Sequence, residues 1–165
     1  MPADSSFDIR YVPNPAEVDN AHHQALKELS QRYDFKGSPA SIEVDKKTLT
    51  FTLVAGDDMK LKALMDILER RLVSRGIGPA AQTAGIPEPA AGGTVRQTLK
   101  VQSGLPEDKI PKITAAVKAL GLKVRTQVQG TEVRVFAREK DDLQAVIAAL
   151  RQQSFGCALE FGNYR

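Results

Sequence analysis

Residues 122–136 read LKVRTQVQGTEVRVF, and this stretch decides how the chain folds. Apolar side chains occupy alternate positions on both sides of Gly130, at Leu122, Val124, Val128, Val133 and Val135. Such alternation is typical of strands that are buried on one face, and a glycine between two of them indicates a turn. We therefore expect a β-hairpin with one apolar face and one polar face.

The segments on either side of this hairpin extend the same domain. Before it, residues 95–101 alternate as a strand does, and residues 110–120 carry apolar side chains at helical spacing. After it, residues 143–150 repeat the helical spacing behind Asp141-Asp142, either of which can cap the helix. Residues 159–161 then form a last strand, which completes the order strand, helix, strand, strand, helix, strand.

The first half of the chain repeats this order. Strand, helix, strand, strand and helix patterns fall at residues 7–11, 15–33, 41–44, 48–53 and 61–72. Asp57-Asp58 precedes the second helix as Asp141-Asp142 does in the other half. Residues 78–93, rich in Ala, Gly and Pro, are interpreted as a linker or mobile loop in which a poorly formed strand can occur. The repeat predicts an α+β fold of two tandem ferredoxin-like (βαββαβ) domains, each an antiparallel sheet with helices on one face.

The composition is that of a folded, soluble protein. Hydrophobic residues make up 42% of the 165 residues, charged residues make up 26%, and the formal net charge is +3. This mild positive charge permits an anionic partner such as RNA or a nucleotide without requiring one. Cys157 is the single cysteine, there is no signal-peptide pattern, and no apolar run approaches the roughly 18 residues that span a bilayer. We expect a cytoplasmic protein with no membrane partner.

Polar side chains that alternate with the apolar strand positions form one candidate surface. They are Arg96, Lys100, Lys123, Arg125, Gln127 and Arg134. Alternate positions of antiparallel strands share a face, so strands of both halves in one surface would make a basic platform for phosphates and base edges. The alternative is a solvated outer face. The basic-glycine-aromatic signature of RRM domains is absent, and the two aromatics of these strands, Phe51 and Phe136, are interpreted as core residues.

The segment Arg32-Tyr33-Asp34-Phe35-Lys36-Gly37 is a second candidate site. A phosphate could contact Arg32 and Lys36 while Tyr33 or Phe35 stacks on a base. The alternative, which the residue types favour slightly, is a helix C-cap in which Gly37 is left-handed. Residues 92–97 (GGTVRQ) are a third candidate, as a backbone anion nest or simply as a flexible hinge.

The chain lacks the sequence patterns of common catalytic and metal sites. His22 and His23 are adjacent and therefore point to different sides of a helix. No Cys-x-x-Cys, His-Glu-x-x-His or Gly-x-Ser-x-Gly occurs. We expect a protein that is not an enzyme and needs no cofactor.

Several motifs in combination resemble the YajQ family of bacterial nucleotide-binding proteins over nearly the whole chain. They are residues 6–9 (SFDI), 17–21 (EVDNA), 32–38 (RYDFKGS), 41–43 (SIE), 92–97 (GGTVRQ), 141–144 (DDLQ) and 161–165 (FGNYR). The resemblance implies two ferredoxin-like domains that exchange their N-terminal strands, with residues 7–11 in the C-terminal sheet and 95–101 in the N-terminal one. The domains would be residues 12–103, including strand 95–101, and residues 1–11 with 104–165. Residues 80–85 depart from the family pattern, which puts the last strand of the first domain in doubt.

The resemblance also implies a function. It is that of a non-enzymatic nucleotide-binding protein, with cyclic di-GMP, GTP or another purine nucleotide as ligand and a signalling role through a transcription factor. The alternatives are a sequence-tolerant RNA- or tRNA-binding protein and a protein-interaction module without a small ligand. The residues expected to bind nucleotide or phosphate are Arg32, Tyr33, Phe35, Lys36, Arg96, Gln97, Lys100, Arg125 and Arg134.

Overall fold

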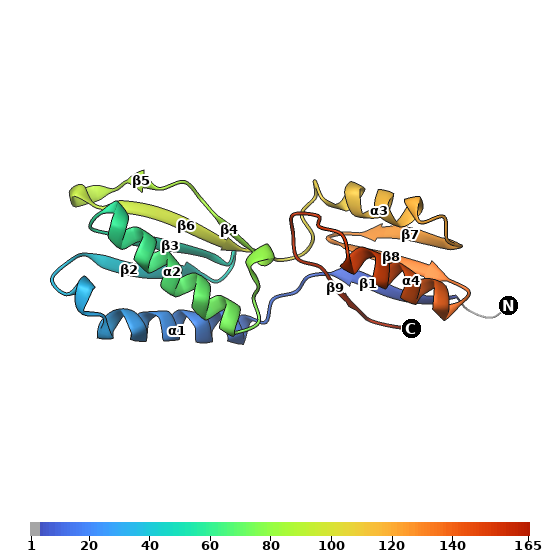
Figure 1. Cartoon of the computed structure of the whole chain (residues 1–165), viewed down its shortest axis with the longest axis horizontal. Coiled ribbons are helices and arrows are strands. Elements are labelled where there is room, and N and C mark those ends of the chain that lie inside the picture. The colour runs from blue at the N-terminus through green and yellow to red at the C-terminus, as the bar shows by residue number, and fades with distance from the viewer. Residues whose placement is uncertain (1–3) are drawn as a thin grey trace. The chain divides into compact units, whose positions relative to one another are not determined.

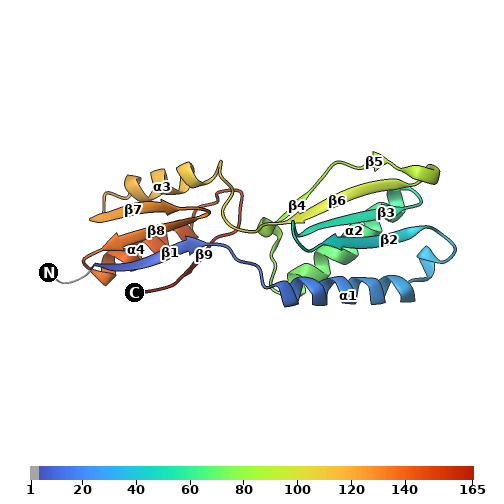
Figure 2. The ribbon, with the colours of Figure 1, turned by 180° about the vertical axis from the view of Figure 1, so that it is seen from behind.

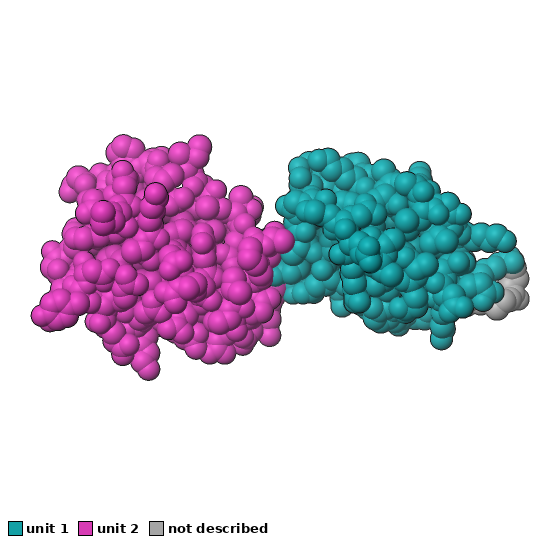
Figure 3. Space-filling view, in the orientation of Figure 1, with its two compact units in different colours: residues 1–12, 102–165 teal, residues 13–101 magenta. Residues whose placement is uncertain are grey.

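The computed structural model describes residues 4–165, which divide into two compact units (Figures 1 and 3). Unit 1 comprises the described residues up to Val12 together with Gln102–Arg165, and unit 2 comprises Pro13–Val101. No helix in this part of the chain combines the length and the apolar character that crossing a bilayer requires.

Unit 2 packs two long helices on one face of an antiparallel sheet. Its elements are α1 (Pro15–Gln31), η1 (Tyr33–Phe35), β2 (Ala40–Asp45), β3 (Thr50–Ala55), α2 (Asp58–Ser74), η2 (Pro79–Ala81), β4 (Gln82–Ala84), β5 (Glu88–Pro89), η3 (Ala91–Gly93) and β6 (Val95–Val101). The strand order is β2-β3-β6-β4, and β5 also pairs with β6. The doubtful last strand of this half is thus present as β4, but it is only three residues long.

Unit 1 has the same architecture. Its elements are β1 (Ser5–Arg10), α3 (Ile110–Ala119), β7 (Val124–Gln129), β8 (Glu132–Ala137), α4 (Lys140–Arg151) and β9 (Glu160–Gly162). The strand order is β7-β8-β1-β9, and every pair of neighbours is antiparallel. The predicted hairpin is β7-β8, in the register Val124↔Ala137 to Gln129↔Glu132.

Strand pairing confirms the predicted ferredoxin-like fold and the exchange of strands. β1, from the start of the chain, lies between β8 and β9 of unit 1. β6, which precedes the helices of unit 1 in sequence, lies between β3 and β4 of unit 2. Each unit therefore obtains one of its two inner strands from the part of the sequence that adjoins the other unit.

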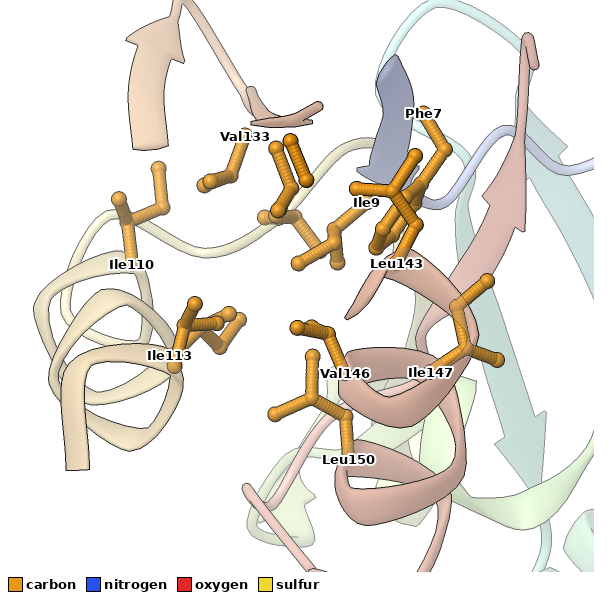
Figure 4. Packing of buried hydrophobic residues seen from close by; sticks show 13 residues of the cluster. Phe7, Ile9, Ile110, Ile113, Val133, Leu143, Val146, Ile147 and Leu150 are labelled. Carbon is orange, nitrogen blue, oxygen red and sulfur yellow. The ribbon is translucent and has the colours of Figure 1, made fainter. Parts of the chain in front are cut away.

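The core of unit 1 lies between its helices and one face of its sheet (Figure 4). Phe7 and Ile9 of β1 are fully buried against Ile113 of α3 and Val146 of α4. Fully burying one such side chain contributes about 1.5–3 kcal/mol, so these alternate positions decide which face of the sheet the helices cover. No helix among the described residues of unit 1 covers the opposite face of this sheet, and Figure 2 looks onto this face.

The starts of two helices differ in a way that their similar sequences did not predict. Asp57 is the N-cap of α2, and its carboxylate accepts a hydrogen bond from the Lys60 amide at 2.8 Å. The N-cap of α4 is Glu139, so the prediction that Asp141 or Asp142 caps this helix was wrong. Both aspartates lie inside the first turn, where they interact favourably with the helix dipole instead.

Candidate functional site

The open sheet face of unit 1 gathers an aromatic ring, cations and a buried acid. Val133, Val135 and Ala137 are buried on the helix side of β8, so the residues between them point to the open face. Phe136 is therefore on the open face and only half-buried, and its interpretation as a core residue was wrong. Phe51, the other aromatic in question, is fully buried in unit 2, as predicted.

Arg125 and Phe136 form a stacked pair on this face. They are directly opposite each other on β7 and β8, and the Arg125 guanidinium lies 4.5 Å from the centre of the Phe136 ring. This distance is within the range of a cation–π interaction. The Arg125 side chain is 70% exposed, and its only ion pair among the described residues is a 3.4 Å contact with Asp4. The pair thus presents a flat, positively charged surface to solvent.

Asp8 anchors the middle of the same face. Its carboxylate accepts hydrogen bonds from Nε of Arg134 at 2.8 Å and from Nδ2 of Asn163 at 2.7 Å, and Asp8 is 2% exposed. Burial by itself would raise the pKa of Asp8. The hydrogen bonds from Arg134 and Asn163, with the charges of Arg134 and Arg10, outweigh that effect and hold the pKa below its usual value. Arg134 is therefore held in place beside the stacked pair by the ionised carboxylate of Asp8.

A pocket of about 560 Å³ adjoins the stacked pair at one end of β7 and β8. It is lined by Asp4, Lys123, Val124, Arg125, Phe136, Ala137, Arg138, Glu139 and Asp142. The volume is within the range of small-molecule sites, and the lining combines cations for phosphate with carboxylates for N–H donors. Sequence reasoning did not select Phe136 or Arg138, although the strict alternation of Val133, Val135 and Ala137 would have placed Phe136 on this face.

The basic strand positions are divided between the two sheets, one in each unit. Arg96 and Lys100 lie on the open face of the unit 2 sheet, opposite Val54 and Thr50. Glu43, Asp45 and Glu88 share that face by register, and Glu88 is 3.9 Å from Arg96. This surface is consequently mixed in charge rather than basic.

Gln97 lies on the opposite face of the sheet from Arg96 and Lys100, because successive side chains of β6 point to alternate faces. It pairs with Leu53, whose side chain is buried under the helices, and so it lies on the helix side of the sheet. Its Nε2 donates a hydrogen bond to the Gly85 carbonyl at 2.8 Å. Gln97 therefore ties the loop after β4 to the sheet.

In the segment 32–37, the residues divide into a structural and an exposed group. Arg32 donates to both carboxylate oxygens of Asp34, at 3.0 and 2.7 Å, and Phe35 is 5% exposed. Gly37 is left-handed with φ +75°, as the C-cap alternative requires. Tyr33 is 84% exposed, and the Lys36 ammonium lies 4.8 Å from the centre of its ring. Among the side chains that were expected to bind a ligand here, Arg32 is paired with a carboxylate and Phe35 is buried in the core. Tyr33 and Lys36 have neither kind of contact and are therefore available to a ligand.

The described residues contain no group of three or more His, Cys, Asp and Glu side chains that could hold a metal ion. His22 uses Nε2 in a 2.7 Å hydrogen bond with the Ile42 carbonyl. Burial raises the pKa of the Cys157 thiol, which disfavours the reactive thiolate.

Comparison with known proteins yields one family over almost the entire chain. The family described as "Nucleotide-binding protein YajQ-like" matches residues 5–165. Curated relatives from Carboxydothermus hydrogenoformans and Desulfitobacterium hafniense are each 47% identical over 165 residues, which cover 100% of both chains. A relative from Bacillus cereus is 45% identical with the same coverage. All three are named nucleotide-binding proteins.

Proposed function

This chain belongs to the YajQ-like family of nucleotide-binding proteins, and we propose that it binds a purine nucleotide on the open face of the unit 1 sheet. The observation that carries the proposal is the Arg125 guanidinium 4.5 Å over the half-buried Phe136 ring, beside a pocket of about 560 Å³. A purine can stack on the exposed side of the guanidinium, with the Phe136 ring beneath it.

The remaining groups suit the rest of a nucleotide. Lys123 and Arg138 line the pocket and can pair with phosphate oxygens. Arg134 is held on the same face by Asp8. It pairs with Gln127, next to the pair formed by Arg125 and Phe136, and provides a further cation there. Cyclic di-GMP is the first ligand to test and GTP the second, because the resemblance to the family implies them.

Calorimetry with cyclic di-GMP, GTP, ATP and CTP tests this function. We expect purine nucleotides to bind, and Phe136→Ala and Arg125→Ala each to weaken binding about tenfold or more, because stacking on one base contributes about 1–3 kcal/mol. Lys100→Ala, which removes an exposed cation from the sheet of unit 2, is the matched control and should leave affinity unchanged. No heat and no change in melting temperature at millimolar nucleotide would contradict the proposal.

The same titration locates the site. If the segment 32–37 holds the ligand instead, Tyr33→Ala combined with Lys36→Ala abolishes binding while Phe136→Ala does not.

We propose binding without turnover, so each nucleotide should be recovered unchanged by chromatography after long incubation. The signalling role is tested by pull-down of a transcription factor with and without cyclic di-GMP. A pull-down that is independent of nucleotide, and that survives charge reversal of Arg32 and Lys36, would favour a protein-interaction module.

Single-stranded RNA is the second candidate, and the open four-strand row β7-β8-β1-β9 with its half-buried Phe136 is the observation that favours it. RRM domains bind splayed bases on such a face. Phosphate contacts would make the affinity for RNA fall steeply with salt. Binding of tRNA that is tighter than that of any mononucleotide, and that falls as salt rises, would assign the face to RNA.

A further inference from the structure

Unit 2 contains a second pocket, of about 480 Å³, between α2 and the strands β4 and β6. It is lined by Asp66, Glu69, Arg70, Val73, Ser74, Pro79, Gln82, Ala84 and Leu99. The pocket lies beside β4, which is only three residues long and ends at the small residue Ala84. Ala84 pairs with Leu99 at the edge of the sheet, and a single methyl group does not cover the flank of α2, where Val73 is 46% exposed.

The pocket carries a negative charge that the described part of the chain does not neutralise. Arg70 already donates to Asp66 at 3.0 Å and to Glu28 at 2.8 Å. No cation within residues 4–165 forms an ion pair with Glu69. Burial raises the pKa of Glu69, and the nearby Asp66 carboxylate raises it further. A positive charge beside Glu69 would favour its ionised form and so oppose both effects.

We propose that this pocket binds a small organic cation, with an apolar body against Val73, Pro79 and Ala84 and an ammonium group paired with Glu69. The volume is within the range of small-molecule sites. An ammonium–carboxylate pair in a partly desolvated site is stronger than the same pair in water. The carboxylates of Asp66 and Glu69 repel phosphates, so this ligand differs in class from the nucleotide proposed for unit 1.

Three probes with the same ring but different charge test the proposal by NMR titration of the full chain. Tryptamine is the cation, indole the neutral analogue and indole-3-acetate the anion. We expect saturable amide shifts at Glu69, Val73 and Ala84 with tryptamine, an affinity for indole about tenfold lower, and no saturable binding of indole-3-acetate. Glu69→Gln should reduce the affinity for tryptamine to that for indole and leave indole unaffected.

Two further variants make the test specific. Glu107→Gln, which removes an exposed acid from unit 1, should change nothing. Ala84→Leu, at an exposed position of β4 that lines the pocket, should occupy part of the pocket and weaken binding of both tryptamine and indole. The proposal is overturned if none of the probes shifts the pocket amides at millimolar concentration, or if tryptamine and indole bind equally well. Undiminished affinity for both probes in Ala84→Leu would overturn it too.

Discussion

Asp8 illustrates how a single residue links the stability of unit 1 to its binding face. It alternates with Phe7 and Ile9 on β1, so it faces away from the core and yet is 2% exposed, beneath Arg134 and Asn163. A buried carboxylate without partners would be strongly unfavourable, and the pairing with Arg134 removes this penalty. The same pairing fixes the position of a cation on the candidate site.

Replacing this carboxylate should have a pH-dependent cost. We expect Asp8→Asn to lower the free energy of unfolding by about 1.5–3 kcal/mol at pH 7, the range for hydrogen bonds to charged groups. The folded-state pKa of Asp8 is below its ordinary value of 3.8, so its stabilisation is present above about pH 4 and is lost as the pH falls through the folded-state pKa. Urea denaturation between pH 7 and pH 2 should show the two proteins converging at the acidic end.

Glu43→Gln is the control for this series, because Glu43 is exposed on β2 of the other unit. It should follow the wild type at every pH. A constant difference between wild type and Asp8→Asn across the whole range would show that the ionised carboxylate is not the stabilising form.

At the scale of elements, the apolar periodicity predicted the helices and most strands, but it did not predict how each helix begins. Asp57 and Asp141 occupy corresponding places in the two halves, yet only Asp57 is an N-cap. In α4 the extended backbone angles that mark the N-cap occur at Glu139, two residues before Asp141, so the helix has already begun when the chain reaches Asp141. Helix boundaries depend on the connecting backbone, and apolar spacing carries no information about it.

The two aspartates should therefore respond differently to salt. Asp57→Ala should destabilise the protein by about 1 kcal/mol, because it removes the hydrogen bond to the Lys60 amide, and the loss should persist at about 1 M salt. Asp141→Ala should cost about 0.3–1 kcal/mol at low salt through the helix dipole, and high salt should abolish that cost. Thermal unfolding at both salt concentrations distinguishes them. Equal and salt-resistant losses would mean that both residues cap.

At the scale of the whole molecule, the exchange of strands makes the two units unequal. All of unit 2 lies within the continuous segment Pro13–Val101, whereas unit 1 needs β1 from the start of the chain. β1 carries Phe7 and Ile9 of the core and separates β8 from β9. Without it, residues 102–165 would expose apolar core positions and unpaired strand edges.

This inequality predicts different behaviour of fragments. Residues 13–101 alone should unfold cooperatively in urea. Residues 102–165 alone should not, and addition of a peptide of residues 4–12 should restore dispersed amide signals in NMR spectra. As a control, a peptide with Phe7→Ser and Ile9→Ser should fail to restore them. A fragment 102–165 that folds without the peptide would show that β1 is dispensable for unit 1.

The local alternation that predicted the fold also predicted part of the candidate site. It did not predict the contacts that the site residues make. Arg125 and Arg134 were selected because they alternate with apolar residues, and this local property also placed them on the open face. The interpretation of Phe136 as a core residue failed because it rested on residue type instead of on its position between Val135 and Ala137. Arg32 and Gln97 look available in the sequence, but both are engaged by distant or local partners.

By itself, the sequence determined the order of elements, the ferredoxin-like class and, through its resemblance to one family, the exchange of strands. These follow from apolar periodicity and motifs that are written along the chain. Only the tertiary structure decided that Arg125 stacks on Phe136, that Asp8 meets Arg134 at a separation of 126 residues, and that a pocket opens beside Ala84. Strand register and edge packing bring these groups together, and both depend on contacts between segments that are far apart in the sequence.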